Sequence, residues 1–186
     1  MENMKKAFSL GVLVGRFQGL HGGHIMMIDT ALSVCGRVGV LIGSANESGT
    51  NKNPFSYETR REMLTRVYGD RIMIAPLDDI GVGNCAAWGE YVIEKAKEHF
   101  GEIPDAAVSG KEPRRVAWLE GSTGERIAEI YVPKTVDISA SRMREFFACG
   151  MREEWERLTP PALHGMYEKL REAVLSSIDN LETTSI

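Results

Sequence analysis

The stretch Gly15–His24, GRFQGLHGGH, decides the fold that this sequence predicts. The short apolar run FSLGVLV of residues 8–14 precedes it, and IMMIDTALSVCG of residues 25–36 follows it. In the second run the apolar residues recur at spacings of three and four, which is typical of an amphipathic helix. The whole segment therefore predicts a buried strand, a glycine-containing turn and a helix that ends at Gly36.

The residues of this turn have the chemistry of a phosphate site. In α/β sheets, ligands bind where strand ends meet helix N-termini, and the free N–H groups there favour anions. His21 and His24 are three apart, so they share one face if the helix has begun. Arg16 adds a guanidinium, while Gly22 and Gly23 let a phosphate chain approach the backbone closely. A metal pair is the alternative for the two histidines, but no Cys or carboxylate at ligand spacing stands beside them.

The composition limits the class of protein. A chain of 186 residues with an ordinary apolar fraction predicts an α/β domain over residues 1–150, which residues 151–186 extend with helices. The net charge of −4 argues against a general nucleic-acid binder, since such proteins carry a basic face. Cys35, Cys85 and Cys149 form no CxxC pair and fit free thiols in a reducing cytosol. No stretch is long enough to span a bilayer, so we expect a cytoplasmic protein without a membrane partner.

The rest of the chain alternates short apolar runs with amphipathic ones. This order predicts an α/β fold, a Rossmann-like parallel five-stranded sheet flanked by helices, with a C-terminal helical extension. The polar loop of residues 44–54 is longer than a simple connection needs, which indicates a substrate loop. Further strands are predicted at residues 37–43, 71–77, 106–109 and 126–132, and helices at residues 55–68, 84–100 and 139–149.

Residues 138–144, ISASRMR, give the second strong signal. Ser139 is placed to cap a helix, and Ser141, Arg142 and Arg144 crowd the first turn. A helix N-terminus already carries about half a positive charge, so two arginines are unfavourable there unless an anion binds. The alternative is a solvated basic turn on a surface helix. Together with the first stretch, the pattern favours phosphate.

These two stretches carry a family resemblance over residues 12–144. The first resembles the GRFQPFHxGH signature of the nucleotidylyltransferase superfamily, and within it the nicotinamide mononucleotide (NMN) adenylyltransferases of the archaeal and bacterial single-domain type. Gly19 and Leu20 stand where that signature has Pro-Phe. The second resembles the ISxTxIR signature, with Ser141 keeping the hydroxyl of the Thr. The resemblance implies the HxGH nucleotidylyltransferase fold and places Arg144 on the triphosphate.

The middle of the chain bears on the substrate. Residues 43–60 resemble the GSAxxSxTxxNPFTxxER stretch of the nicotinamide enzymes, with Lys52 at a basic position near phosphate and Thr59 in place of Glu. Asn84 and Trp88 match an Asn-three-residues-Trp pattern that holds the nicotinamide ring in that group. At i and i+4 the two point the same way, an amide for the carboxamide and an indole for the cationic ring. A Trp88 that only fills the core is the alternative.

Two further segments receive structural interpretations. Asp78 and Asp79 precede the nicotinamide helix, where we expect them to shape the pocket without a catalytic role. Residues 152–157, REEWER, are interpreted as an exposed helix face around Trp155.

The resemblance implies transfer of AMP from ATP to NMN, which forms NAD and releases pyrophosphate. The NMN phosphate would attack the α-phosphorus in line, and catalysis would be positioning plus charge stabilisation. Mg²⁺ would be held through the ATP phosphates and water, with no protein ligands. Relatives form homo-oligomers, so a homo-oligomer is implied. The implied catalytic residues are Arg16, His21, His24 and Arg144; those for ATP and phosphate are Gly15, Phe17, Gly23, Lys52, Ser109, Gly110, Ser139, Ser141 and Arg142; and those for nicotinamide are Asn84 and Trp88.

Two other functions remain open from the sequence. The nearer is the same chemistry on another phosphorylated acceptor, either nicotinic acid mononucleotide or phosphopantetheine, or a cytidylyl transfer. The second is a nucleotide-sensing module that binds without turnover. Intact His21, His24 and Arg144 argue against the sensing module, since a site without turnover has no need to keep them.

Overall fold

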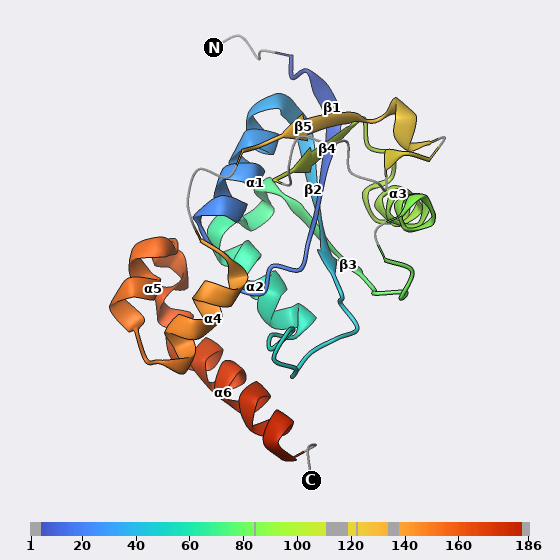
Figure 1. Ribbon diagram of the computed structural model, residues 1–186. Coiled ribbons are helices and arrows are strands. Elements are labelled where there is room, and N and C mark those ends of the chain that lie inside the picture. Colours follow the sequence, from blue (N-terminus) through green and yellow to red (C-terminus); the bar gives the residue numbers. More distant parts are fainter. Residues whose placement is uncertain (1–4, 84, 111–118, 122, 134–137, 184–186) are drawn as a thin grey trace.

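Five parallel strands form one sheet in the order β3-β2-β1-β4-β5 (Figure 1). The computed structural model describes residues 5–83, 85–110, 119–121, 123–133 and 138–183. The predicted parallel, Rossmann-like sheet is confirmed, and β1 at its centre carries the GRFQ turn at its end. The strands are β1 (Phe8–Gly15), β2 (Cys35–Gly43), β3 (Met73–Leu77), β4 (Ala106–Ser109) and β5 (Ala128–Tyr131).

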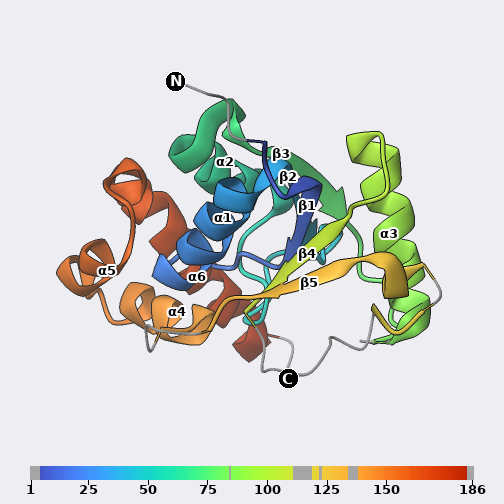
Figure 2. The same ribbon diagram turned by 90° about the horizontal axis from the view of Figure 1, so that it is seen from above.

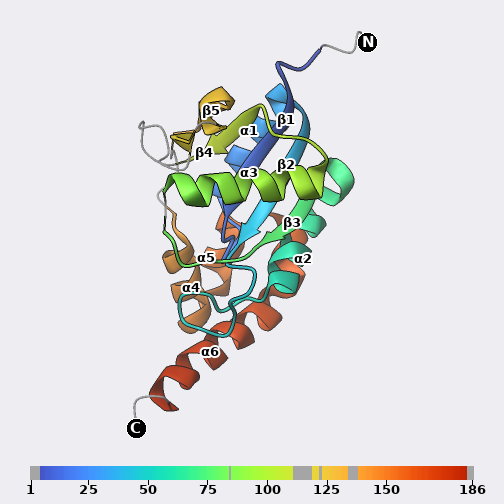
Figure 3. The ribbon, with the colours of Figure 1, turned by 90° about the vertical axis from the view of Figure 1, so that its right-hand side faces the viewer.

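Helices cover both faces of this sheet unequally. Of the helices described, α3 alone lies across one face, while α1 and α2 cover the other and α4–α6 pack beside them (Figures 2 and 3). In the described parts of the chain, no helix is both long and apolar enough to cross a membrane. The helices are α1 (Gly22–Val34), α2 (Tyr57–Tyr68), α3 (Ala86–Phe100), α4 (Ala140–Ala148), α5 (Arg152–Leu158) and α6 (Tyr167–Thr183), with short 3-10 turns at Gly69–Arg71, Gly124–Arg126 and Pro161–Met166.

Three helix ends lie where the sequence predicts them. The Ser56 hydroxyl accepts a hydrogen bond from the Thr59 amide at 3.3 Å and caps α2. Ser139 caps α4 through the Arg142 amide at 3.2 Å. Gly101 ends α3 with φ of 88°, a left-handed conformation that glycine adopts without strain.

The end of α1 differs from the prediction of a stop at Gly36. The helix ends at Val34 and β2 begins at Cys35, with no connecting residue between them. The Cys35 amide still donates to the Ala31 carbonyl while its own backbone is already extended. Gly36 lies inside the strand, where a Cβ would come within 3.2 Å of the Ser9 carbonyl oxygen. Close strand packing therefore explains this glycine.

Alternating side chains of β1 supply two cores. Leu13 packs into the core beneath α1 and α2, whereas Val12 packs into the core beneath α3. Val92 and Ala96 of α3 are fully buried in the second core. The sheet is thus fixed from both sides, which holds its strand ends at defined positions.

The core beneath α1 and α2 continues into the C-terminal helices. Trp155 is only 1% exposed. The centroid of its ring lies 5.3 Å from the ring centroid of Phe147 and 5.4 Å from that of Tyr167. The expected exposed face holds for charged neighbours such as Glu153, but not for Trp155 itself. This shared core supports the proposal that residues 151–186 extend the domain rather than form another.

Candidate active site

The turn after β1 places an aromatic ring against His24. Phe17 has φ of 51°, a left-handed conformation that is strained for a bulky residue. Its ring is buried and lies 5.0 Å from the His24 ring. A Cβ at Gly15 would come within 3.1 Å of this ring, so glycine allows the close packing. Because the Phe17 side chain is buried against His24, only the backbone of Phe17 could contact a phosphate.

The two histidines form an adjacent pair, as their spacing predicts. His21 is the N-cap of α1, and its Nδ1 accepts a hydrogen bond from the Gly23 amide at 3.2 Å. The centroids of the His21 and His24 rings are 3.9 Å apart. An Nδ1 that accepts a hydrogen bond leaves the proton of a neutral ring on Nε2, which makes that atom of His21 a donor.

His24 has the properties of a residue built for a polar ligand. Its Nδ1 is buried without a hydrogen-bond partner in the described structure. Burial, and then the neighbouring His21, lowers the pKa of His24 from 6.5 to about 3. His24 is therefore neutral at pH 7 in the free protein, and a buried imidazole nitrogen without a partner is costly unless a ligand supplies one.

The lowered pKa of His24 predicts a loss of stability in mild acid. Below pH 6.5 the unfolded chain binds a proton at this residue, whereas the folded chain does not until about pH 3. Between pH 7 and pH 5 the free energy of unfolding should fall by about 2 kcal/mol more in the native protein than in His24→Ala. Urea unfolding at both pH values measures this difference, and equal losses in the two proteins would contradict it.

Two arginines from separate elements, Arg16 after β1 and Arg144 in α4, lie close enough for their charges to interact. Burial, followed by the charge of Arg16, lowers the pKa of Arg144. Arg144 donates to the Ser141 hydroxyl at 3.1 Å, and within the described chain it has no carboxylate partner. Two neighbouring guanidiniums without a shared carboxylate indicate an anion site. Arg142 instead pairs with Glu145 at 2.8 Å, on the exposed side of α4.

Two clefts open at the carboxyl ends of the strands, near the turn that follows β1. The Trp88 cleft has a volume of about 370 Å³, and the histidine cleft has one of about 130 Å³. Such a crevice forms at the carboxyl ends of parallel strands where the strand order reverses, as it does between β1 and β4. The Trp88 cleft is lined by Val14, Gly15, Arg16, Gly43, Ser44, Leu77, Asp78, Asp79, Gly83 and Trp88, and the histidine cleft by His21, Gly23, His24, Met26, Met27, Gly110, Val132, Pro133 and Ile138.

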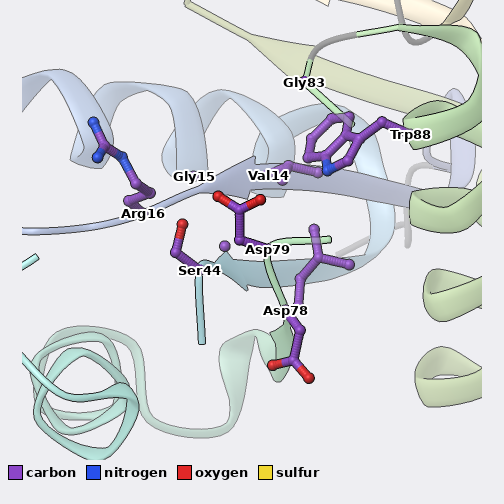
Figure 4. Close-up of a pocket in the computed structure, with 10 residues that line it drawn as sticks. Val14, Gly15, Arg16, Ser44, Asp78, Asp79, Gly83 and Trp88 are labelled. Carbon is purple, nitrogen blue, oxygen red and sulfur yellow. The ribbon is translucent and has the colours of Figure 1, made fainter. Parts of the chain in front are cut away.

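The Trp88 cleft has an aromatic end and a cationic end. Figure 4 shows the Trp88 indole at one end, Arg16 at the other and the Asp79 carboxylate between them. Trp88 is half-buried and also packs against the core beneath α3. It therefore contributes to packing and still presents its ring to the cleft. Asn84, its predicted partner, lies outside the described residues.

Two polar side chains that lie within the family signatures, but were given no role from the sequence, hold the walls of the site together. Arg60 is 0% exposed, and its guanidinium donates to the carbonyls of Arg16 at 3.1 Å and Gly43 at 2.7 Å. It also donates to Ser44 at 3.0 Å, so that it joins the ends of β1 and β2. Gln18 exchanges two hydrogen bonds with the backbone of Phe55, at 2.9 and 3.2 Å.

The remaining predicted residues occupy different positions. Gly110 lines the histidine cleft, where a Cβ would lie 2.8 Å from the Met27 sulfur, and Ser109 ends β4 beside it. Lys52 is exposed on the loop between β2 and α2 and lines neither cleft. Thr59, the departure from the family pattern, supplies the amide that Ser56 caps. No group of three metal-ligating side chains occurs among the residues that are described.

Known proteins match this chain along most of its length. A family model described as Cytidylyltransferase-like matches residues 12–146. The nicotinamide-nucleotide adenylyltransferase of Thermococcus kodakarensis is 32% identical over 183 residues, which cover 94% of this chain and 91% of that protein. The protein of the same name from Aeropyrum pernix is 30% identical over 165 residues, which cover 86% of this chain and 90% of that protein.

Solved structures share the fold at lower identity. A bifunctional NMN adenylyltransferase/ADP ribose pyrophosphatase from Francisella tularensis, complexed with AMP and a Mn ion, superposes with a TM-score of 0.75 at 21% identity. The match covers 95% of this chain but 53% of that one, so this chain spans about half its length. From the matched family model and the similarity to full-length relatives, the chain belongs to the cytidylyltransferase-like family, alongside nicotinamide-nucleotide adenylyltransferases.

Proposed function

We propose that this protein transfers AMP from ATP to NMN, forming NAD and releasing pyrophosphate. The observation that carries the proposal is the pair of clefts at the carboxyl ends of the strands, one lined by His21 and His24 and the other by Arg16 and Trp88. A reaction that joins two nucleotides through phosphate needs two binding sites and cations where they meet. The similarity to nicotinamide-nucleotide adenylyltransferases supports this choice over other acceptors.

The histidine cleft suits ATP, and the Trp88 cleft suits NMN. Apolar side chains line the histidine cleft, including Met27, Val132 and Ile138, and provide a surface for the adenine. Arg16 at one end of the Trp88 cleft provides for the NMN phosphate, and the indole of Trp88 at the other end provides a stacking face for the pyridinium ring.

The reaction needs no protein base, because the NMN phosphate is already an anion. One of its oxygens forms a bond to the α-phosphorus while the bond from that phosphorus to the bridging oxygen breaks, and pyrophosphate leaves. His24 would donate to an oxygen on the α-phosphorus, and Arg16 and Arg144 would neutralise the phosphate charge. Bound through the ATP phosphates and water, Mg²⁺ would supply further charge neutralisation.

Pyrophosphate release from ATP tests the proposal directly. With Mg²⁺ present, NMN, nicotinic acid mononucleotide and phosphopantetheine are offered as separate acceptors, and product is identified by mass. NMN should give NAD with the highest kcat/KM. Release with phosphopantetheine alone, or ATP binding without release for any acceptor, would contradict the proposed function.

Removing the indole should weaken the use of NMN more than that of ATP. Stacking of a base on an aromatic ring is worth about 1–3 kcal/mol, so Trp88→Ala should raise the KM for NMN by about 5- to 150-fold. The KM for ATP should change little, because Trp88 does not line the histidine cleft. Steady-state kinetics with each substrate varied measure both values, and Trp88→Phe, which keeps a stacking face, is the control.

A further inference from the structure

The Trp88 cleft is electrically polarised along its length. Arg16 stands at one end and Trp88 at the other, and Asp79, the second residue after β3, lies between them. Figure 4 shows the carboxylate of Asp79 directed into the space between Arg16 and Trp88, whereas that of Asp78 is directed away from Trp88. A ligand with an anionic phosphate at one end and a cationic ring at the other matches this polarity.

Asp79 is held in place by hydrogen bonds from two sides. The Asn46 side chain accepts from the Asp79 amide at 2.9 Å and donates to the Asp79 carbonyl at 3.3 Å. Oδ1 of Asp79 accepts from the Gly81 amide at 2.9 Å. No hydrogen bond to Oδ2 occurs in the described structure, so one carboxylate oxygen remains available to a ligand.

We propose that Asp79 is a specificity-determining residue that selects a pyridine nucleotide with a carboxamide over one with a carboxylate. This inference rests on the proposed function of the Trp88 cleft. A carboxamide N–H can donate to Oδ2 of Asp79, whereas a carboxylate has no donor and adds a second negative charge. Such a pair is repelled and leaves a polar group without a partner, which is the strongest form of discrimination between similar ligands.

The variant Asp79→Asn isolates this effect. The Asn side chain keeps an oxygen that can accept from the Gly81 amide, so the local turn is retained while the charge is removed. The ratio of kcat/KM for NMN to that for nicotinic acid mononucleotide should fall about tenfold or more, because two like charges no longer face each other. Asp70→Asn removes the same charge at an exposed position that lines neither cleft and should leave the ratio within about twofold.

Calorimetric binding of both mononucleotides to each protein separates this proposal from the proposed function. If the native protein binds NMN more tightly and Asp79→Asn reduces that preference, the assignment of Asp79 stands even if no pyrophosphate is released. An unchanged preference in Asp79→Asn, an equal loss of preference in Asp70→Asn, or no binding of either mononucleotide would overturn it. Thermal unfolding of the three proteins should differ by only a few degrees, which excludes misfolding as the cause.

Discussion

Replacing His24 with alanine should lower kcat by about 10²–10³ with little change in fold. Removal of one preorganised hydrogen-bond donor at a developing charge typically has an effect of this size. His24 is already neutral and lacks a partner at Nδ1 in the described structure, so the free protein loses little when the ring is removed. Pyrophosphate release under saturating ATP and NMN measures kcat, and circular dichroism checks the fold.

His99→Ala is the matched control for this experiment. His99 is exposed near the end of α3 and lines neither cleft. Its replacement removes the same side chain and should leave kcat within about twofold, as for surface positions generally. Near-normal turnover in His24→Ala, or an equal loss in His99→Ala, would exclude His24 from the catalytic machinery.

Replacing Arg60 with methionine should produce the largest loss of stability. Methionine fills a similar volume, but it leaves buried carbonyls at the ends of β1 and β2 without their donor. Breaking such a buried charged network costs about 3–5 kcal/mol. For a chain of this length the midpoint of thermal unfolding should fall by about 6–20 °C. The KM for NMN should also rise, because the Ser44 wall of the Trp88 cleft is no longer held.

Arg61→Met provides the control for the effect of Arg60. Arg61 is the next residue of α2 and is exposed, so the same change there should shift the midpoint by no more than about 2 °C. Arg60→Lys should lie between the two, since an ammonium cannot reproduce the fork of a guanidinium. Equal midpoints for Arg60→Met and Arg61→Met would show that the hydrogen bonds of Arg60 contribute nothing to stability.

Local sequence patterns were sufficient to predict the parallel sheet and the adjacent pair of histidines. The apolar run before Gly15 and the spacing of His21 and His24 each depend on residues that are neighbours along the chain. Ser56 and Ser139 likewise cap helices that begin one residue later. These features follow from backbone geometry over a few residues, which a sequence displays directly.

Features that depend on distant segments were not accessible in this way. Arg60 is buried because its partners are main-chain carbonyls from the ends of β1 and β2, and main-chain atoms carry no sequence signal. Trp155 lies among charged residues, so its neighbours along the chain do not reveal that α4 and α6 bury it. The predicted end of α1 at Gly36 was wrong, because in the sequence a glycine needed for strand packing looks the same as a glycine that ends a helix.

The direct passage from α1 into β2 fixes the length of this part of the polypeptide. One residue inserted between Val34 and Cys35 would shift β2 by one position and exchange its two faces. The position of Gly39 would then receive a side chain, yet a Cβ there would lie 2.4 Å from the Phe100 ring. The junction cannot take up an insertion, so an engineered graft or label belongs in the surface loop between β2 and α2 instead.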